Sequence, residues 1–218
     1  MSTLPPPSRG APPSSMGAPP SSRGAPPPSS RGGARGCIKG TVLVSRLAFV
    51  RGQRGSIGVG EVIRRLREED QPTFTNAILP FGWYSFELYS RLDAAIAEVM
   101  DQGKGIFRVL GAVSARDNLG GDHKRFLQGR DPHGLLRNAA SLYKLYYDTG
   151  ERTYERTGDR TAILRTSGGR AFSAADCLTV VGWHEKAIEM CGGQSPRVTE
   201  TSCRARGAVV CEYLCEWG

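Results

Sequence analysis

A chain of 218 residues with a net charge of +8 is long enough for one or two domains. Four of those positive charges lie within the first 36 residues, and the remaining basic residues are mixed with Asp and Glu. This distribution lacks the concentrated basic face of a specific nucleic-acid-binding protein, so we expect no such partner.

The first 36 residues consist almost entirely of Pro, Ser, Gly, Ala and Arg. A seven-residue unit occupies Ala11–Gly17 and recurs at Ala18–Gly24. Such a segment buries too little apolar surface to offset the entropy of ordering it. We therefore predict a disordered tail over residues 1–36 and a single folded domain over residues 37–218.

Prolines stand where a secretory signal would carry its apolar run, and no stretch approaches the roughly 20 apolar residues of a membrane span. The chain also contains six cysteines. In the absence of a signal we expect reduced thiols, most of them packed as small core side chains. These features predict a cytoplasmic protein.

The first part of the predicted domain reads as helical. Apolar residues at helical spacing predict two short helices, Thr41–Val50 and Val59–Arg67, separated by glycines. A clearer amphipathic pattern covers Trp83–Met100. A further helix is expected from Gly105 to about Leu127, with a possible break at Gly120 and Gly121.

The next segment predicts a helix followed by a hairpin. Asp131 followed by Pro132 is a favourable helix start, because the carboxylate can accept from free N–H groups and proline fits the first turn. We expect this helix to run to Gly150. Two strands should follow, over Glu151–Thr157 and Thr161–Thr166.

The last segment repeats this order. Ser173 predicts the start of a helix that ends near Gly192, and two strands are expected over Arg197–Arg204 and Ala208–Trp217. Within the final strand the alternation places Cys211, Tyr213 and Cys215 on one buried face. The chain is therefore predicted to be an α+β domain, with helices packed on a four-stranded antiparallel sheet of order ββαββ.

Several segments resemble one superfamily when they are taken in order. They are Ile38–Val42, Tyr84–Met100, Asp131–Gly150 with the two strands after it, and the closing Cys203…Gly207…Cys211-Glu-Tyr. Together they resemble the fold of haem-based nitric oxide/oxygen-binding (H-NOX) domains, vinyl-reductase-like ligand-binding domains and TRAPP trafficking subunits. More closely, Phe81–Tyr89, Tyr146–Glu151 and Cys211–Trp217 are similar to an uncharacterised paralogous family known mainly from myxobacteria.

The resemblance implies a binding module more than an enzyme. H-NOX members hold haem through a histidine on the helix before the sheet, whereas the matching stretch Ala139–Tyr146 contains none. The Tyr-x-Ser-x-Arg signature that binds the haem propionates is also missing from Thr161–Thr166. We therefore expect no haem. No nucleophile, base and orienting group converge in the sequence either, so we expect no catalytic activity.

Candidate ligand contacts are aromatic residues predicted near the junction of helices and sheet. They are Trp83, Tyr84, Tyr143, Tyr146 and Trp183, joined by His184 in an apolar helical stripe. Ordinary core packing would explain the same residues. Of the other histidines, His133 is expected at the surface and His123 in a loop.

We expect no metal site; if one exists, Cys203 and Cys211 are its ligands, because some vinyl-reductase-like domains bind zinc. Cys215 is unsuited to join Cys211 on a regular strand, since the two positions lie about 13 Å apart along it.

Two functions follow from the resemblance. The first is a non-enzymatic cytoplasmic sensory or adaptor module that binds a small apolar ligand between helices and sheet. We expect it to form a homodimer through its N-terminal helices. The alternative is a protein-interaction subunit with a filled core, which engages a small GTPase or another protein as TRAPP subunits do.

Overall fold

The computed structural model describes residues 36–121, 123–127 and 129–218. Residues 1–35 lie outside the described part, so the structure does not test the predicted tail. No helix in the described ranges is long and apolar enough to span a bilayer.

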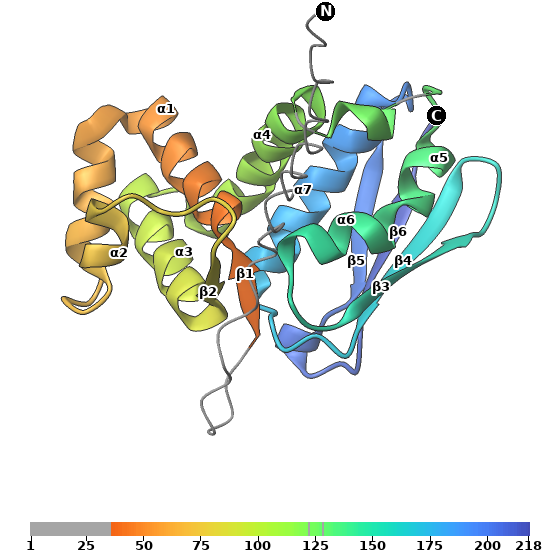
Figure 1. Cartoon of the computed structure of the whole chain (residues 1–218). Coiled ribbons are helices and arrows are strands. Elements are labelled where there is room, and N and C mark those ends of the chain that lie inside the picture. Colours follow the sequence, from red (N-terminus) through yellow and green to blue (C-terminus); the bar gives the residue numbers. More distant parts are fainter. Residues whose placement is uncertain (1–35, 122, 128) are drawn as a thin grey trace, which may run out of the picture.

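The N-terminal half is a helical layer joined to a short ribbon (Figure 1). Its helices are α1 (Gly40–Arg65), α2 (Gln71–Thr75) and α3 (Phe86–Met100). The ribbon consists of β1 (Cys37–Lys39) paired antiparallel with β2 (Trp83–Ser85). Strands of three residues are too short to show an alternating pattern, which is why the sequence predicted Trp83 as the start of a helix.

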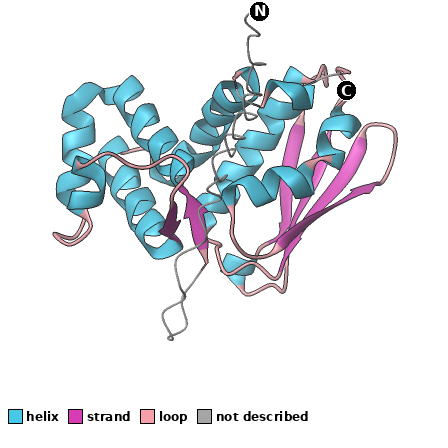
Figure 2. Cartoon of the chain, viewed as in Figure 1, coloured by secondary structure: helices cyan, strands magenta, loops and turns pink. Residues whose placement is uncertain are grey.

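The C-terminal half contains the sheet and the helices that cover it (Figure 2). Its helical elements are η1 (Gly103–Gly105), α4 (Ile106–Gly120), η2 (Lys124–Leu127), α5 (Pro132–Arg137), α6 (Ala139–Tyr146), α7 (Ala174–Met190) and η3 (Arg204–Arg206). Its strands are β3 (Glu151–Arg156), β4 (Thr161–Ser167), β5 (Arg197–Ser202) and β6 (Cys211–Glu216). They form one antiparallel sheet in the order β3-β4-β6-β5. The predicted α+β class and four-stranded sheet are confirmed.

Local signals placed several boundaries correctly. The carboxylate of Asp131 accepts from the backbone N–H groups of His133 and Gly134, and the Ser173 hydroxyl accepts from the N–H of Asp176. The helix predicted from Asp131 to Gly150 is instead two helices, because Asn138 between them leaves helical geometry.

The two helices predicted at the N-terminus meet end to end within α1. Gly55 interrupts the helical backbone there, with φ 63° and ψ −167°. A positive φ of this size favours glycine over residues with a Cβ atom. The glycine-rich segment therefore divides α1 into two helical segments joined at a kink, in line with the two predicted helices.

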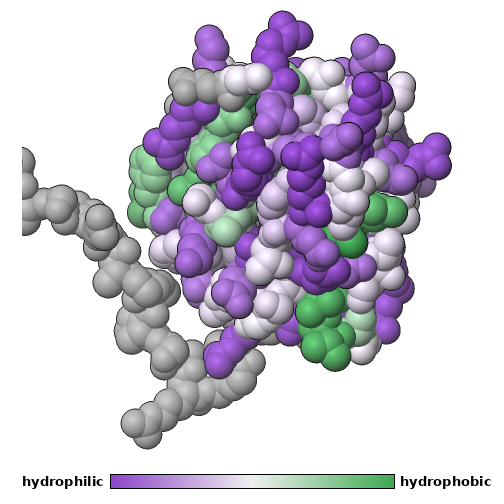
Figure 3. All heavy atoms as spheres, turned by 90° about the vertical axis from the view of Figure 1, so that its right-hand side faces the viewer, coloured by the Kyte–Doolittle hydropathy of each residue, from purple (hydrophilic) through white to green (hydrophobic). Residues whose placement is uncertain are grey.

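One face of the sheet is buried and the other is polar. Buried residues alternate along β6 at Cys211, Tyr213 and Cys215, as predicted, and they pack with α5, α6 and α7. On the opposite face Arg165 binds Glu155 at 2.5 Å and Glu212 at 2.6 Å. The side of the molecule that carries the sheet is accordingly mostly hydrophilic (Figure 3).

His133 corrects another prediction. The sequence placed it at the surface, yet the side chain is 5% exposed. Its ring nitrogens contact the Tyr154 hydroxyl and the Asp159 carbonyl, both at 2.8 Å, and the ring lies against Trp217. The short helix α5 thus packs its first turn against the sheet instead of solvent.

Helices α4 and α7 touch backbone to backbone. A Cβ atom on Gly111 of α4 would lie 2.1 Å from the Thr179 carbonyl oxygen, and one on Gly182 of α7 would lie 1.9 Å from the Arg108 carbonyl oxygen. Neither distance is sterically possible, so both glycines are required by this close approach.

We predict that Gly182→Ala lowers the free energy of unfolding by about 1–3 kcal/mol or more, because the added methyl group forces the two helices apart. Gly52→Ala is the matched control, since a Cβ atom there meets nothing within 4 Å. It should raise stability by about 0.5–1 kcal/mol through helix propensity. Urea unfolding followed by circular dichroism measures both values, and equal effects of the two variants would contradict the packing argument.

Candidate functional site

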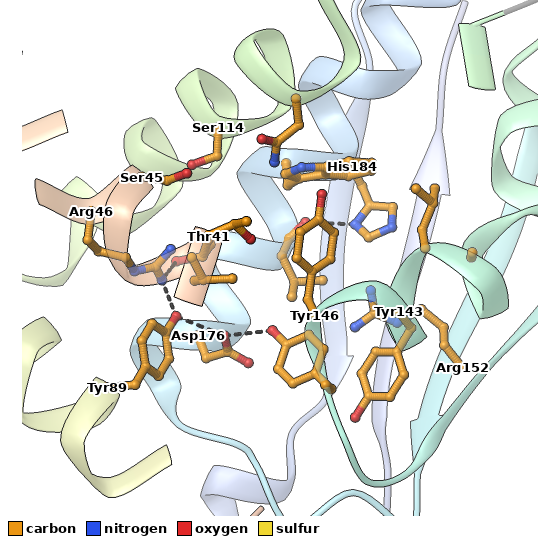
Figure 4. A pocket seen from close by; sticks show the side chains of 18 residues that line it. Thr41, Ser45, Arg46, Tyr89, Ser114, Tyr143, Tyr146, Arg152, Asp176 and His184 are labelled. Atoms are coloured by element: carbon orange, nitrogen blue, oxygen red, sulfur yellow. Dashed lines mark hydrogen bonds between the residues drawn. The ribbon is translucent and has the colours of Figure 1, made fainter. Parts of the chain in front are cut away.

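A partly open cavity of about 80 Å³ lies where the two halves of the molecule meet (Figure 4). Helices α1, α3, α4, α6 and α7 and strand β3 contribute to its wall. The side chains that line it are Thr41, Val42, Ser45, Arg46, Tyr89, Ser114, Asn118, Ala139, Leu142, Tyr143, Tyr146, Tyr147, Arg152, Asp176, Thr179, Val180, Trp183 and His184. The cavity therefore combines apolar and aromatic surface with buried charges.

A buried charge network forms one end of the cavity. Arg46 of α1 is 1% exposed and binds the carboxylate of Asp93 at 3.0 Å and the Thr179 hydroxyl at 3.0 Å. It also donates to the Tyr89 hydroxyl. The Tyr89 hydroxyl in turn donates to Asp176 at 3.0 Å. This network joins α1, α3 and α7 through their side chains.

The tyrosines of this network act as hydrogen-bond donors. Burial raises the pKa of Tyr89 and of Tyr147 well above the usual value, so both stay protonated. The Tyr147 hydroxyl donates to the same oxygen of Asp176 at 2.8 Å. Burial also raises the pKa of Asp176, while Arg46 and the two hydroxyls favour its ionised form.

Arg152 enters the cavity from strand β3, at the end away from Arg46 (Figure 4). Its side chain is 8% exposed, and its Nε donates to the Thr166 hydroxyl at 2.9 Å. The guanidinium lies over the rings of Tyr143 and Tyr213, at 5.1 Å and 5.7 Å from their centroids. A second basic group therefore lies inside the protein.

His184 borders the same space from α7. The ring is 4% exposed, and its Nδ1 lies 2.8 Å from the Val180 carbonyl oxygen, which requires Nδ1 to carry the proton. Burial, followed by the nearby charge of Arg152, lowers the pKa of His184 to about 3. The imidazole is therefore neutral at physiological pH and presents Nε2 as a hydrogen-bond acceptor.

Four of the six predicted ligand contacts line the cavity: Tyr143, Tyr146, Trp183 and His184. Trp83 and Tyr84 do not line it, because β2 carries them to the ribbon beside α1. There the ammonium of Lys39 lies 4.2 Å from the Trp83 ring centroid, and the Tyr84 hydroxyl accepts from the Leu79 N–H.

The charged residues of the cavity were not predicted. In the sequence Arg46 and Arg152 resemble ordinary surface arginines, and Asp176 reads as part of a helix start. One pattern could have predicted the burial of Arg46. It follows Leu43 by three residues and therefore lies on the same, apolar face of the helix.

A cluster of three cysteines and one glutamate lies beside the first turn of α7, on the side away from the buried charge network. The Sγ atoms of Cys177, Cys203 and Cys211 and a carboxylate oxygen of Glu200 all lie within 4.8 Å of one another. The Cys177 Sγ is 3.7 Å from that of Cys203 and 3.8 Å from that of Cys211. The Glu200 Oε1 atom is buried and has no hydrogen-bond partner among the described residues.

Two of the sulfur–sulfur distances in this cluster match those of a four-coordinate metal site. A tetrahedral zinc with Zn–S bonds of about 2.3 Å places its sulfur ligands about 3.8 Å apart. The hydrogen bond from Cys177 and then the Arg204 N–H lower the pKa of Cys211 to about 6, despite burial. Cys203 and Cys211, the two ligands that the sequence offered if a metal site exists, thus lie together, and Cys177 and Glu200 complete the set.

The comparisons with known proteins identify the fold. No family model and no curated protein sequence matches the chain. Among solved structures, the Fe(II) NO-ligated H-NOX protein from S. oneidensis aligns with a TM-score of 0.66 at 14% identity, over 83% of this chain and 99% of that one. The Fe(II) unliganded H-NOX protein from K. algicida gives a TM-score of 0.64 at 13% identity, over 83% and 96%.

A third neighbour is described as an oxygen-binding H-NOX domain related to soluble guanylate cyclases. It aligns with a TM-score of 0.62 at 14% identity, over 82% of this chain and 94% of that one. The chain therefore has the fold of H-NOX domains, as its sequence pattern predicted. Identities of 13% and 14% relate the folds and do not transfer a ligand.

Haem does not fit the cavity in this arrangement. Helix α6 carries no histidine that could bind the iron. The cavity of about 80 Å³ is roughly half the size of an engineered cavity of about 150 Å³ that holds benzene, and a porphyrin is several times larger than benzene. Binding haem would require the surrounding helices to move apart.

We predict that His184 makes the protein less stable in acid. Between pH 6.5 and 3, His184 binds a proton in the unfolded protein but not in the folded protein. Its contribution to the free energy of unfolding is therefore fully present above pH 6.5 and is lost as the pH falls. The slope contributed by His184 approaches about 1.4 kcal/mol per pH unit. Urea unfolding across this range should show a shallower dependence for His184→Phe than for wild type. Identical slopes for the variant and the wild type would contradict the prediction.

Proposed function

We propose that the chain is a non-enzymatic sensory or adaptor module that binds a small, mainly apolar ligand in the central cavity. The observation that carries this proposal is the position of the cavity, bordered by α1 from the helical half and by α6, α7 and β3 from the sheet half. A ligand there contacts both halves, so its binding changes how they pack together. Val42, Leu142 and Trp183 offer the apolar contacts.

We further propose a cytoplasmic homodimer of the uncharacterised myxobacterial type. All six cysteines are free thiols, which supports a reducing compartment. Val44 and Ile57 of α1 are 39% and 78% exposed, which supports a dimer contact on the N-terminal helices.

A second candidate function is a protein-interaction subunit with an effectively filled core, with a small GTPase as one class of partner. The small volume of the cavity favours this alternative, because it is below the range of about 300–1,000 Å³ typical of ligand pockets. Leu79 and Phe81, in the loop before β2, are 66% and 83% exposed and offer apolar contacts to a partner.

Purified protein should carry a small molecule that native mass spectrometry detects and denaturation in solvent releases. Ala139→Leu, which adds three carbon atoms at the cavity wall, should abolish this species. Ala140→Leu is the control, because the neighbouring side chain is exposed and the variant should retain the molecule. Wild-type protein with no bound molecule would favour the filled-core alternative, and a bound haem would contradict the expected ligand class.

We also propose that zinc binds Cys177, Glu200, Cys203 and Cys211. Three thiolates and one carboxylate suit zinc, and a set with four protein ligands is typical of structural sites. Zinc would satisfy the buried Glu200 oxygen and tie the loop between β5 and β6 to the start of α7.

Elemental analysis of purified protein should then give one equivalent of zinc per chain. Cys177→Ser should lose the metal and unfold at a lower temperature, because the remaining ligands no longer close the coordination sphere. Cys191→Ser, a change at a buried cysteine outside the cluster, should keep it. Wild-type protein without zinc, after growth and purification with added zinc, would overturn the assignment.

A further inference from the structure

Arg152 differs from the other buried arginine of the cavity. Arg46 forms an ion pair with Asp93 at 3.0 Å, and both side chains are 2% exposed. Within residues 36–121, 123–127 and 129–218, no carboxylate lies within ion-pair distance of Arg152, although its side chain is 8% exposed. Arg152 is therefore a cation that the protein has buried without a direct counter-charge.

The contacts of Arg152 orient the guanidinium and leave its outer end available. The Thr166 hydroxyl accepts from Nε at 2.9 Å. The rings of Tyr143 and Tyr213 lie against the guanidinium plane. In the described part of the chain no hydrogen bond is formed by the two terminal nitrogens, which are directed into the cavity (Figure 4). These nitrogens form the fork that binds a carboxylate through two parallel hydrogen bonds.

Asp176 does not neutralise this charge at contact distance. Asp176 is close enough for the charge of Arg152 to favour its ionised form, but the two side chains form no ion pair. One Asp176 oxygen instead accepts from both Tyr89 and Tyr147. Burying a charge without a partner is costly, and arginines buried in proteins are therefore paired. No carboxylate in the described part of the chain pairs with Arg152 at contact distance, so a ligand that enters the cavity can supply the partner.

We infer that the ligand is a small organic carboxylate whose anionic group binds Arg152 and whose apolar part lies against Leu142 and Trp183. This inference rests on the proposed ligand-binding function and names the class of ligand. The cavity of about 80 Å³ limits the acid to a chain of about two to four carbons. Acetate, propionate and butyrate are suitable probes.

Isothermal titration calorimetry on the full chain, at constant sodium chloride concentration, tests this assignment. At least one of the three acids should bind with saturation, and its amide (acetamide, propionamide or butyramide) should bind at least about tenfold more weakly because it lacks the charge. Arg152→Met should abolish binding of the acid. Arg152→Lys keeps the charge but loses the fork, so its affinity should fall by about tenfold.

Two controls separate binding from folding. Arg156→Met changes an arginine on the same strand whose side chain is 52% exposed, and it should bind the acid like wild type. In the absence of ligand, Arg152→Met should unfold at an unchanged or higher temperature, because it removes an unpaired buried charge. A large decrease in that temperature would assign Arg152 a structural role and overturn the inference.

The remaining outcomes distinguish this inference from the proposed function. Tight binding of the amides, or of another uncharged molecule, with no preference for the acids would keep the ligand-binding function and overturn the carboxylate. Binding of chloride with the same affinity as the acids would make Arg152 a site for inorganic anions and would also overturn it. Absence of any bound or binding small molecule would overturn both.

Discussion

The arrangement of the two halves depends on the burial of Arg46. A guanidinium inside a protein is tolerated when its hydrogen bonds and charge are satisfied, and here α3 supplies Asp93 and Tyr89 while α7 supplies Thr179. Removing one partner of such a buried pair typically costs about 3–5 kcal/mol, so the network strongly favours one placement of α1 against α3 and α7. That placement fixes one end of the cavity.

The sequence predicts those parts of this structure that depend on neighbours along the chain. The cap at Asp131 and the alternation of β6 are local patterns, and both are present. Arg46 and Asp93 are 47 residues apart, and nothing in either segment indicates that the two charges meet. The same holds for the cysteine cluster: Cys203 and Cys211 share a hairpin, whereas Cys177 joins them only because α7 crosses the sheet. These contacts between distant residues form through tertiary packing, which local sequence patterns do not reveal.

The cavity and the cysteine cluster are connected through consecutive residues of α7. Asp176 belongs to the buried charge network, and Cys177 contributes its sulfur to the cluster. The Ser173 hydroxyl binds the N–H of Asp176 and fixes the helix start between them. Adjacent helical residues point about 100° apart, which allows one turn to serve two sites. A metal ion in the cluster would therefore hold the carboxylate at the cavity in position without touching it.

The glycine contact between α4 and α7 has a mechanical consequence. Two backbones that touch directly cannot rotate or slide against each other without collision, so the two helices behave as one rigid body. A displacement of α7 at the cavity would therefore move α4 with it. The outward surface of α4, where Val109 is 51% exposed, would then relay an internal event to whatever binds the exterior.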